Sequence, residues 1–555
     1  MTSNPGTPIS RRTAIAGVVG AAITACTSSD SGEPAGDTVA ESTTAPERTE
    51  STTTAAPTTT EAPRIDAIPS PAYAGDNPFV LGIASGDPDE TSVVLWTRLV
   101  ANDLALEQDV AVDVATDDTF TELVSSSLTT TTADHAHSAH VIAAALEPNS
   151  WYSYRFRVGD HTSPVGRSRT TPRPGQESPM RLGFSSCQNW ESGGYAAHRH
   201  LAEADLDLFV WLGDYIYEYG PGNRGVVSSA GLREHDSPEV TDLAGYRGRY
   251  ALYKSDPALQ SHHAARPWAV TWDDHEIDNN HAGLTTEDGQ EETAFLERRR
   301  AAHQAWWEHM PVRLDPPSGD TFRIHRSIHW GETASIHLLD GRQYRDPQPT
   351  DGDPVELGGV VVQTLGPTAN DPAHTMLGTE QESWLIDAVD TSPGRWQVLG
   401  NQVYMHGLNA LPGEVPTINT DSWDGYHGSR RALLEALAGT RAENLVVLTG
   451  DFHAASVGDV HTDPFDRSSP VVATEFMAPA ISSTFPASLR PLAPLALAVN
   501  PQIRHFDPDN GFMTCVVDGA TWTTELHILD DVTDEASGIS VRASFAITNG
   551  TAGVA

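Results

Sequence analysis

Cysteine is scarce in this chain, which has only Cys26, Cys187 and Cys515 among its 555 residues. So few thiols exclude a small disulfide-rich scaffold, in which several bridges replace a core. The length instead allows two or more domains with a large core, and the hydrophobic content of 39% is ordinary for a globular protein.

Basic residues are also few, since 34 lysines and arginines face 75 acidic residues and leave a formal net charge of −41. A surface of this sign repels a phosphate backbone, so the composition excludes a nucleic-acid-binding role. The simplest interpretation is a solvated acidic surface that keeps an exported protein soluble.

No apolar run is long enough to span a bilayer permanently. The weakly apolar stretch at 13–25 follows Ser10-Arg11-Arg12, which is typical of twin-arginine export of a folded protein. Ile23-Thr-Ala-Cys26 matches a lipobox, so residues 1–26 predict a signal that leaves Cys26 as a lipidated first residue. We expect a cell-surface lipoprotein or a secreted protein; the alternative is an ordinary cleaved signal with an incidental cysteine.

If Cys26 is lipidated, two thiols remain in an oxidising compartment. Cys515 lies in the apolar run Gly511–Val517, where a buried strand cysteine is expected. Cys187 then needs protection, and metal ligation would supply it. The competing interpretation is a disulfide between Cys187 and Cys515.

The chain divides by composition into a linker, an all-β part and an α/β part. Residues 27–70 are rich in Ser, Thr, Glu, Ala and Pro, which predicts a disordered tether. Residues 71–172 contain alternating apolar segments such as Tyr152–Val158, which predict a small sandwich similar to fibronectin or immunoglobulin domains. Residues 173–555 alternate strands with helices, which predicts an α/β layered domain.

Within the α/β part, ligand-rich segments follow apolar strands at four places, and in such folds sites gather at the carboxyl ends of strands. The predicted strands are Met180–Ser186, Leu206–Leu212, Ala269–Trp272, Ala334–Leu339, Trp396–Gly400 and Asn444–Thr449, and the predicted helices include Glu292–His309 and Thr379–Val389. The four segments are Phe184–Gln188, Gly213–Glu218, Trp272–Asn280 and Gly450–His453. Together they predict a multinuclear metal site.

The ligand types indicate two kinds of cation. Cys187, Asp214 and Tyr217 offer anionic sulfur and oxygen, a set that favours Fe³⁺ over Zn²⁺. The aspartates and asparagines of 273–280 offer hard oxygens suited to Ca²⁺, Mg²⁺ or Mn²⁺. Each residue alone has a structural alternative: Asp214 could cap a helix, Tyr217 could pack, and His275 could bond a carbonyl.

The whole motif set resembles the PhoD-type alkaline phosphatases. It comprises Ser186-Cys-Gln188, Gly213–Glu218, Trp272–Glu276 with Asn279-Asn280, Arg298–Arg300 before Trp306–Met310, Arg342-Gln-Tyr-Arg345, Gly450–His453 and Glu475-Phe with Pro479–Ser483. Gly82–Pro88 and Val94–Arg98 are similar to the β-domain of that family. One departure is Asn500–Phe506 with Asp509–Phe512, where the family more often has an Arg-Gly-Tyr ending.

The resemblance implies a calcineurin-like metallophosphatase fold that holds Fe³⁺ and two Ca²⁺ ions. It implies that iron is held by Cys187, Asp214, Tyr217 and Asp451, and that the calcium side is formed by Asp214, Asp274, Asn279 and His453. His275 is expected beside the substrate phosphate, and Arg300 is expected to clamp it through a bidentate guanidinium. The alternative for Arg300 is the solvated face of a helix.

The resemblance also implies an alkaline phosphatase that acts on phosphate monoesters and diesters by metal-assisted in-line attack. One alternative is a phosphodiesterase similar to phospholipase D that acts on lipid or cell-wall diesters. An alternative of another class is a surface binding protein with a vestigial metal site.

Overall fold

A computed structural model describes residues 65–222, 231–357 and 360–554. The signal predicted at 1–26, with its twin-arginine motif and Cys26, lies outside the described residues, as does most of the linker predicted at 27–70. The described residues belong to one compact unit. In that part of the chain, no helix is long and apolar enough to cross a membrane.

The first of two large sheets has nine strands in the order β24-β23-β22-β9-β10-β11-β1-β2-β5. Its centre is parallel, because β10 pairs in parallel with both β9 and β11. The strands are β1 Ile83–Gly86, β2 Val93–Arg98, β5 Ser138–Ala143, β9 Met180–Ser185, β10 Leu208–Leu212, β11 Pro267–Thr271, β22 Gly511–Val517, β23 Thr521–Leu529 and β24 Ile539–Thr548.

The second large sheet has seven strands in the order β12-β13-β16-β18-β20-β19-β21. Strands β13, β16, β18 and β20 are parallel neighbours. The strands are β12 Arg326–Trp330, β13 Ala334–Leu338, β16 Trp396–Gly400, β18 Leu445–Thr449, β19 Ala455–His461, β20 Val471–Met477 and β21 Ile503–Asp507. A small sheet joins β14 Pro354–Leu357, β15 Val360–Thr364 and β17 Thr417–Ile418.

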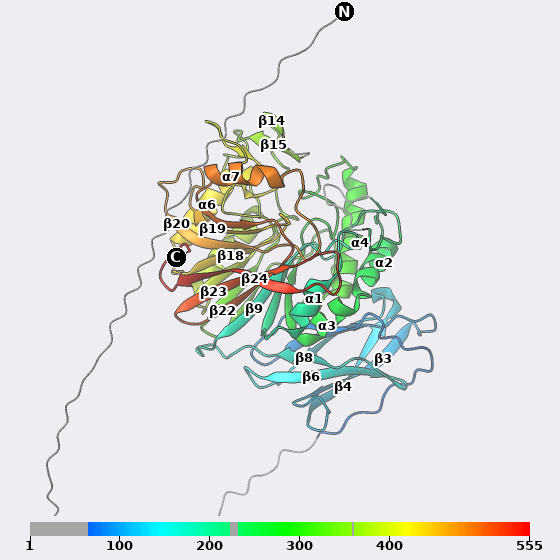
Figure 1. Ribbon diagram of the computed structural model, residues 1–555. Helices are drawn as coiled ribbons and strands as arrows, with labels where there is room; N and C mark the ends of the chain where they lie inside the picture. The colour runs from blue at the N-terminus through cyan, green and yellow to red at the C-terminus, as the bar shows by residue number, and fades with distance from the viewer. Residues whose placement is uncertain (1–64, 223–230, 358–359, 555) are drawn as a thin grey trace, which may run out of the picture. The chain divides into compact units, whose positions relative to one another are not determined.

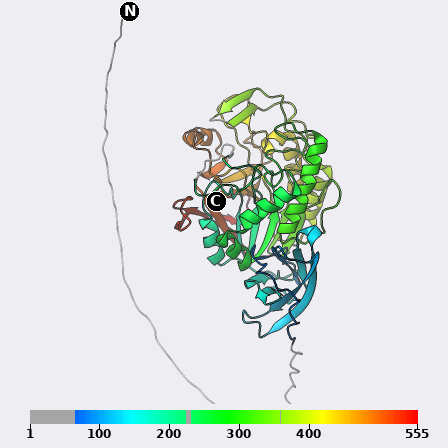
Figure 2. The same cartoon turned by 90° about the vertical axis from the view of Figure 1, so that its right-hand side faces the viewer.

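The two sheets pack face to face, and helices cover their outer faces (Figures 1 and 2). Strand β10 shows why: Leu208, Val210 and Leu212 enter the core between the sheets, whereas Phe209 and Trp211 contact helices. Because both faces are covered, the central strands are buried throughout, as parallel strands require. Helices α1 Ala196–Glu203, α2 Leu243–Lys254, α3 Pro257–Ala265 and α4 Glu292–His309 cover the first sheet, and α5 Gly378–Thr391 and α6 His427–Ala438 cover the second.

The predicted α/β layering is confirmed, and each predicted strand is present with bounds that differ by no more than two residues. The two named helices appear as α4 and α5. The remaining described helices are α7 Ala493–Val499 and the 3₁₀ turns η1 Ala133–His135, η2 Trp423–Tyr426 and η3 Arg490–Leu492.

The N-terminal part is all β, as predicted, but one layer of its sandwich belongs to the nine-stranded sheet. A five-stranded sheet is formed by β3 Glu107–Ala115, β4 Leu123–Thr132, β6 Trp151–Val158, β7 His161–Thr162 and β8 Gly166–Arg169. It packs on β1 and β2, which continue the large sheet because β1 pairs in parallel with β11. Leu95 of β2 enters the sandwich core, while its neighbour Trp96 faces helix α2. The two parts of the chain therefore share one sheet.

Candidate metal centre

The predicted ligand segments meet where the carboxyl ends of both sheets come together. Cys187 follows β9, Asp214 and Tyr217 follow β10, and the segment from Asp273 follows β11. Asp451 and His453 come from the other sheet, after β18. Convergence of parallel strand ends is the reason that residues far apart in sequence share one site.

The ligand residues have unusual backbone conformations. Cys187, Asp214, Asp451 and His453 have φ values of 59°, 58°, 62° and 57°. This left-handed region is costly for residues with a side chain, by about 1 kcal/mol or more each, and such strain clusters at functional sites. The surrounding core therefore stabilises loop conformations that the local sequence disfavours.

Two glycines allow these loops to approach one another. Gly213 has a φ of 108°, and a Cβ there would lie 2.4 Å from the Cβ of Asp273. A Cβ on Gly450 would lie 2.2 Å from Oγ of Ser186, which precedes Cys187. Both contacts are far too short for real atoms, so a side chain at either position would push the ligand segments apart.

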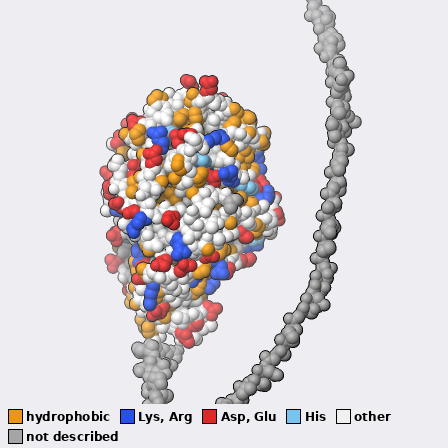
Figure 3. All heavy atoms as spheres, turned by 90° about the vertical axis from the view of Figure 1, so that its left-hand side faces the viewer, with side chains coloured by type: hydrophobic (Ala, Val, Ile, Leu, Met, Phe, Trp, Pro, Cys, Tyr) orange, Lys and Arg blue, Asp and Glu red, His pale blue; other side chains and the backbone are white. Residues whose placement is uncertain are grey.

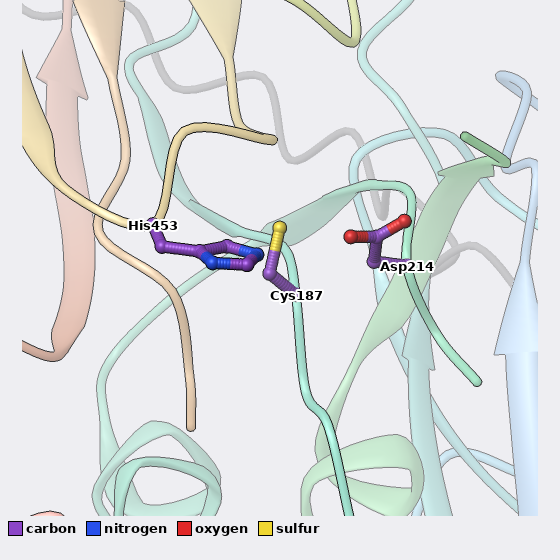
Figure 4. Close-up of side chains that lie close together, drawn as sticks. All are labelled: Cys187, Asp214 and His453. Atoms are coloured by element: carbon purple, nitrogen blue, oxygen red, sulfur yellow. The ribbon is translucent and has the colours of Figure 1, made fainter. Parts of the chain in front are cut away.

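The ligands form three overlapping groups whose donor atoms all lie within 4.8 Å of one another in each group. Cys187, Asp214 and His453 form the first group, and Figure 4 shows the cysteine sulfur between the imidazole and the carboxylate. The second contains Asp214, Asp274 and His275, and the third contains Asp273, Asp274 and Asp451. Since Asp214 and Asp274 are each shared by two groups, the geometry suits adjacent cations bridged by carboxylates.

Tyr217 completes the first group. Its hydroxyl oxygen lies 2.8 Å from Oδ2 of Asp214, 3.2 Å from Nε2 of His453 and 2.8 Å from Oγ of Ser483. The ring is fully buried and lies beside the ring of His275 at a tilt of 30°, with 4.0 Å between ring centroids. A phenol held among ligand atoms in this way is placed to bind a cation as phenolate.

The electrostatics of the cluster favour a bound cation. Burial raises the pKa of Cys187 and of Tyr217, and the nearby Asp214 carboxylate raises both further. Burial also raises the pKa of Asp214 and Asp451, and Asp273 raises that of Asp451 further. Without positive charge these groups would hold protons, whereas a multivalent cation stabilises their anionic forms.

Buried polar atoms without a hydrogen-bond partner show whether a metal ion fits the site. Among the described residues, Oδ1 of Asp214 and Oδ2 of Asp273 are buried without a hydrogen-bond partner. A buried carboxylate oxygen without a partner is costly, and coordination to a cation removes that cost. The sulfur, phenol and carboxylate donors therefore fit a highly charged ion such as Fe³⁺ in the first group, and the aspartate oxygens fit a hard ion such as Ca²⁺.

His275 is fixed by Glu218, whose Oε2 lies 2.7 Å from Nδ1 of the imidazole. Burial alone would lower the pKa of His275, but the carboxylates of Glu218, Asp214 and Asp274 outweigh it and raise the pKa well above its usual value. A protonated imidazole at the edge of the cluster is suited to bind an anion.

Arg342 is the main site residue to which the sequence assigned no role. It is fully buried after β13, a fifth strand end at the site, and its Nε donates to Oδ1 of Asp273. Its Nη1 lies 2.9 Å from Oδ1 of Asp421, and its Nη2 lies 3.4 Å from Oδ1 of Asp451. Its place in Arg342-Gln-Tyr-Arg345, after an apolar run, is the signal that could have revealed it.

The structure does not bring Arg300 to the site. Its side chain is 48% exposed on α4 and pairs with Asp320, so the alternative of a solvated helix face describes it. The neighbouring Arg298 is buried and pairs with Asp278 and Glu239. Since α4 turns Arg300 outward, the phosphate clamp expected from the resemblance is not formed by this side chain.

Two further expected ligands lie as follows. His453 lies in one group with Cys187, while Asp451 lies with Asp273 and Asp274, and the expected division between iron and calcium sides stays a prediction. Asn279 donates its backbone N–H to Glu218 at 3.0 Å, and its side-chain amide donates to Glu287 at the exposed rim. The turn after Asp278 carries that amide nitrogen toward solvent.

The alternative disulfide is wrong, because Cys187 and Cys515 are both free and buried. Cys515 lies in β22 opposite Leu182, and its sulfur is 3.3 Å from Oγ1 of Thr524. Cys515 is thus a buried strand residue, as predicted.

Comparison with known proteins agrees with this geometry. The PhoD-like phosphatase family matches residues 182–526, and the PhoD-like phosphatase N-terminal domain matches residues 65–172. Alkaline phosphatase D of Bacillus subtilis (strain 168) is 41% identical over 478 residues, which cover 84% of this chain and 80% of that protein.

Solved structures show the same relationship. A structure of PhoD matches with a TM-score of 0.80 and 37% identity, covering 89% of this chain and 93% of that chain. The purple acid phosphatase PPD1 from yellow lupin (Lupinus luteus) shares the fold alone, with a TM-score of 0.51 and 12% identity over 84% of this chain and 74% of that chain. The predicted calcineurin-like fold is therefore confirmed. Its sequence, its fold and its buried metal-ligand cluster together make this chain a member of the PhoD-like phosphatase family, a phosphoric ester hydrolase with an all-β N-terminal domain.

Proposed function

We propose that the protein hydrolyses phosphate monoesters and diesters at alkaline pH, at a centre that holds Fe³⁺ and two Ca²⁺ ions. The observation that carries the proposal is the buried pair of ligand groups around Cys187 and around Asp451, which Asp214 and Asp274 bring next to each other. Cys187, Asp214, Tyr217 and His453 would hold the iron. Asp273, Asp274 and Asp451 would hold the calcium ions.

When bound, the ions supply Lewis acidity toward the phosphate and lower the pKa of water. The chain's own residues position the phosphate and the metal ligands and neutralise their negative charge. His275, held by Glu218, donates a hydrogen bond to a phosphate oxygen and offsets the negative charge of the in-line transition state. Arg342 holds Asp273 and Asp451 in place from the buried side.

Replacement of Tyr217 tests the iron assignment. Tyr217→Phe keeps the ring in its buried position but removes the phenolate, so we expect weaker iron binding, loss of the visible phenolate-to-iron absorption, and a turnover at least about tenfold lower. Elemental analysis, the absorption spectrum and hydrolysis of p-nitrophenyl phosphate measure these effects.

Tyr215→Phe is the matched control. Tyr215 is in the same loop and equally buried, but its hydroxyl contacts His263, 2.8 Å away, rather than the ligand cluster. It should retain iron, absorption and turnover. Unchanged iron content and rate in Tyr217→Phe would refute the assignment of that residue.

The substrate range is tested by comparing a monoester with a diester that share one leaving group, p-nitrophenyl phosphate and methyl p-nitrophenyl phosphate. A strong preference for the diester would favour the alternative of a phosphodiesterase similar to phospholipase D. Absence of hydrolysis of either ester by the metal-loaded protein would favour a binding protein with a vestigial site.

We also propose export by the twin-arginine machinery and lipidation at Cys26, which the motif at 10–12 and the lipobox at 23–26 support. Arg11→Lys with Arg12→Lys should retain the precursor inside the cell, and Cys26→Ala should abolish incorporation of labelled palmitate. Normal export of the double variant would contradict the twin-arginine route. Incorporation of labelled palmitate into the Cys26→Ala variant would contradict lipidation at Cys26.

A further inference from the structure

An apolar pocket of about 110 Å³ lies beside a loop that carries metal ligands. One wall contains Phe452, which stands between the ligands Asp451 and His453. Another wall contains Phe485, two residues after Ser483, whose Oγ lies 2.8 Å from the Tyr217 hydroxyl. The pocket is thus continuous with the loops that carry the metal ligands.

Aromatic rings lead from the metal loop into the pocket. Phe452 lies 5.6 Å from Phe485 between ring centroids, and Phe485 lies 5.5 Å from Phe506. On the other side, Phe452 makes an edge contact with Tyr404 at 5.4 Å. These ring contacts connect the residue between Asp451 and His453 to the rest of the pocket lining.

The pocket offers little to a polar ligand. None of the described residues that line it carries a charged carboxylate, lysine or arginine side chain. Of its polar groups, His406 and Ser456 bond each other at 3.1 Å, Oδ1 of Asn419 accepts the backbone N–H of Asp421, and the buried hydroxyl of Tyr404 has no hydrogen-bond partner among the described residues. This lining contrasts with the metal centre itself, where Arg342, Glu218 and the aspartates lie.

Helix α7, drawn in orange in Figure 1, forms the outer wall. Its sequence is Ala-Pro-Leu-Ala-Leu-Ala-Val, and none of its residues is buried. Ala496 and Leu497 line the pocket, whereas Leu495 is 46% exposed and does not. An apolar helix that buries none of its residues leaves surface available for an apolar ligand.

We propose that this pocket receives an alkyl or acyl chain of the phosphate ester, so that the substrate class is an amphiphilic phosphate ester. The inference rests on the proposed function, because the phosphate must bind at the metal centre for its chain to enter the pocket. A chain buried beside the site stabilises the bound state by about fourfold in affinity per methylene group.

The test compares methylphosphonate with octylphosphonate as inhibitors of p-nitrophenyl phosphate hydrolysis, below the micelle concentration of the octyl compound. The two share a head group and differ only in the chain. We expect the inhibition constant of octylphosphonate to be lower by about tenfold or more. Equal constants would overturn the proposal while leaving the phosphatase function intact.

Two substitutions in one helix give the control. Leu497→Glu places a charge in the pocket and should bring the ratio of the two constants close to one. Leu495→Glu places the same charge on the outer side of α7 and should keep both the ratio and the turnover. Neither leucine is buried, so both variants should fold.

Other outcomes are also decisive. If Leu497→Glu and Leu495→Glu change the ratio of the inhibition constants equally, the proposal that the pocket binds the chain is wrong. It is also wrong if the protein binds phosphatidylcholine vesicles and both substitutions weaken that binding equally, because the apolar surface would then bind a membrane. If no ester is hydrolysed, the proposed function fails. Calorimetry on the metal-loaded protein then tests whether the pocket binds the chain. Tighter binding of octylphosphonate than of methylphosphonate would support the proposal, and equal binding would refute it.

Discussion

At the residue scale, the active centre depends on residues whose backbone conformation or buried charge is unfavourable when each is taken alone. Cys187, Asp214, Asp451 and His453 adopt the left-handed backbone region, and the carboxylates are buried beside one another. Figure 3 shows a different situation on the outside, where acidic and basic side chains are interspersed with hydrophobic ones. The interior cluster is thus a local concentration of negative charge that needs compensation.

Arg342 supplies the largest internal compensation. Arg342→Gln removes the guanidinium that pairs with Asp273 and Asp274, whereas Asp421 keeps its pair with Arg345; we therefore expect a loss of about 3 kcal/mol in the free energy of unfolding and at least about a tenfold loss of turnover. Arg342→Lys should restore little of the stability or the turnover, because an ammonium group cannot reproduce the planar array of N–H donors of a guanidinium. Denaturant unfolding and steady-state kinetics measure both effects.

Arg300→Gln is the control for this prediction. Arg300 is 48% exposed and pairs with Asp320, and exposed pairs contribute little. Its unfolding free energy should stay within about 0.5 kcal/mol of the parent, with unchanged turnover. A large loss of turnover in Arg300→Gln, together with a mild Arg342→Gln, would reverse our assignment of the two arginines.

At the element scale, strand β2 joins the N-terminal sandwich to the catalytic layers. Trp96 of β2 donates Nε1–H to the carbonyl oxygen of Glu308 in α4 at 3.0 Å. Nζ of Lys254, in α2, lies 4.4 Å from the centre of the Trp96 ring. Lys254 is fully buried and is the only lysine in the sequence.

This lysine makes stability depend on pH. Burial lowers the pKa of Lys254 from 10.5 to about 7, so the unfolded chain binds more protons than the folded chain between these values. The folded state is therefore penalised below pH 7, and the penalty disappears as the pH rises toward 10.5. We expect Lys254 to contribute an increase of up to about 5 kcal/mol in unfolding free energy over that range.

The measurement compares the parent protein with Lys254→Met by denaturant unfolding at several pH values. The difference between the two should shrink or change sign as the pH rises. Because the chain has one lysine, ¹³C-lysine labelling gives a single Cε signal whose titration midpoint reports the pKa directly. A midpoint near 10.5 and a constant difference in stability would contradict the prediction.

The strand ends show which features of these elements could be predicted. Apolar runs such as Leu208–Leu212 identified the central strands, because a strand covered on both faces must be apolar throughout. The merging of β1, β2 and β5 into the large sheet could not be predicted, since edge pairing depends on which strand surfaces meet after folding.

At the scale of the whole molecule, metal binding and folding should be coupled. Burial raises the pKa of Cys187, Asp214, Tyr217 and Asp451, so each of these groups binds a proton more readily when no cation is bound. Binding of metal ions, tested with the proposed Fe³⁺ and Ca²⁺, to protein treated with a chelator should therefore release protons and raise the melting temperature.

Calorimetry in two buffers with different ionisation enthalpies measures the released protons, and thermal unfolding measures the stability. More protons should be released at pH 6 than at pH 9, because fewer of the ligands are ionised beforehand at low pH. Tyr217→Phe should release one proton fewer. Metal binding without proton release at either pH would contradict the buried environment of the ligands.

The sequence by itself determined the α/β layering, the ligand types and the four strand ends that carry them, because burial patterns and donor chemistry are local properties. It also supplied the thiol of Cys187 and the phenol of Tyr217, on which the proposal of iron rests. Only the tertiary structure decided that Arg342 rather than Arg300 enters the centre, that His453 joins Cys187, and that an apolar pocket opens beside Phe452. These outcomes depend on which way a helix or loop turns once two sheets pack, and that rotation is set by contacts between segments hundreds of residues apart.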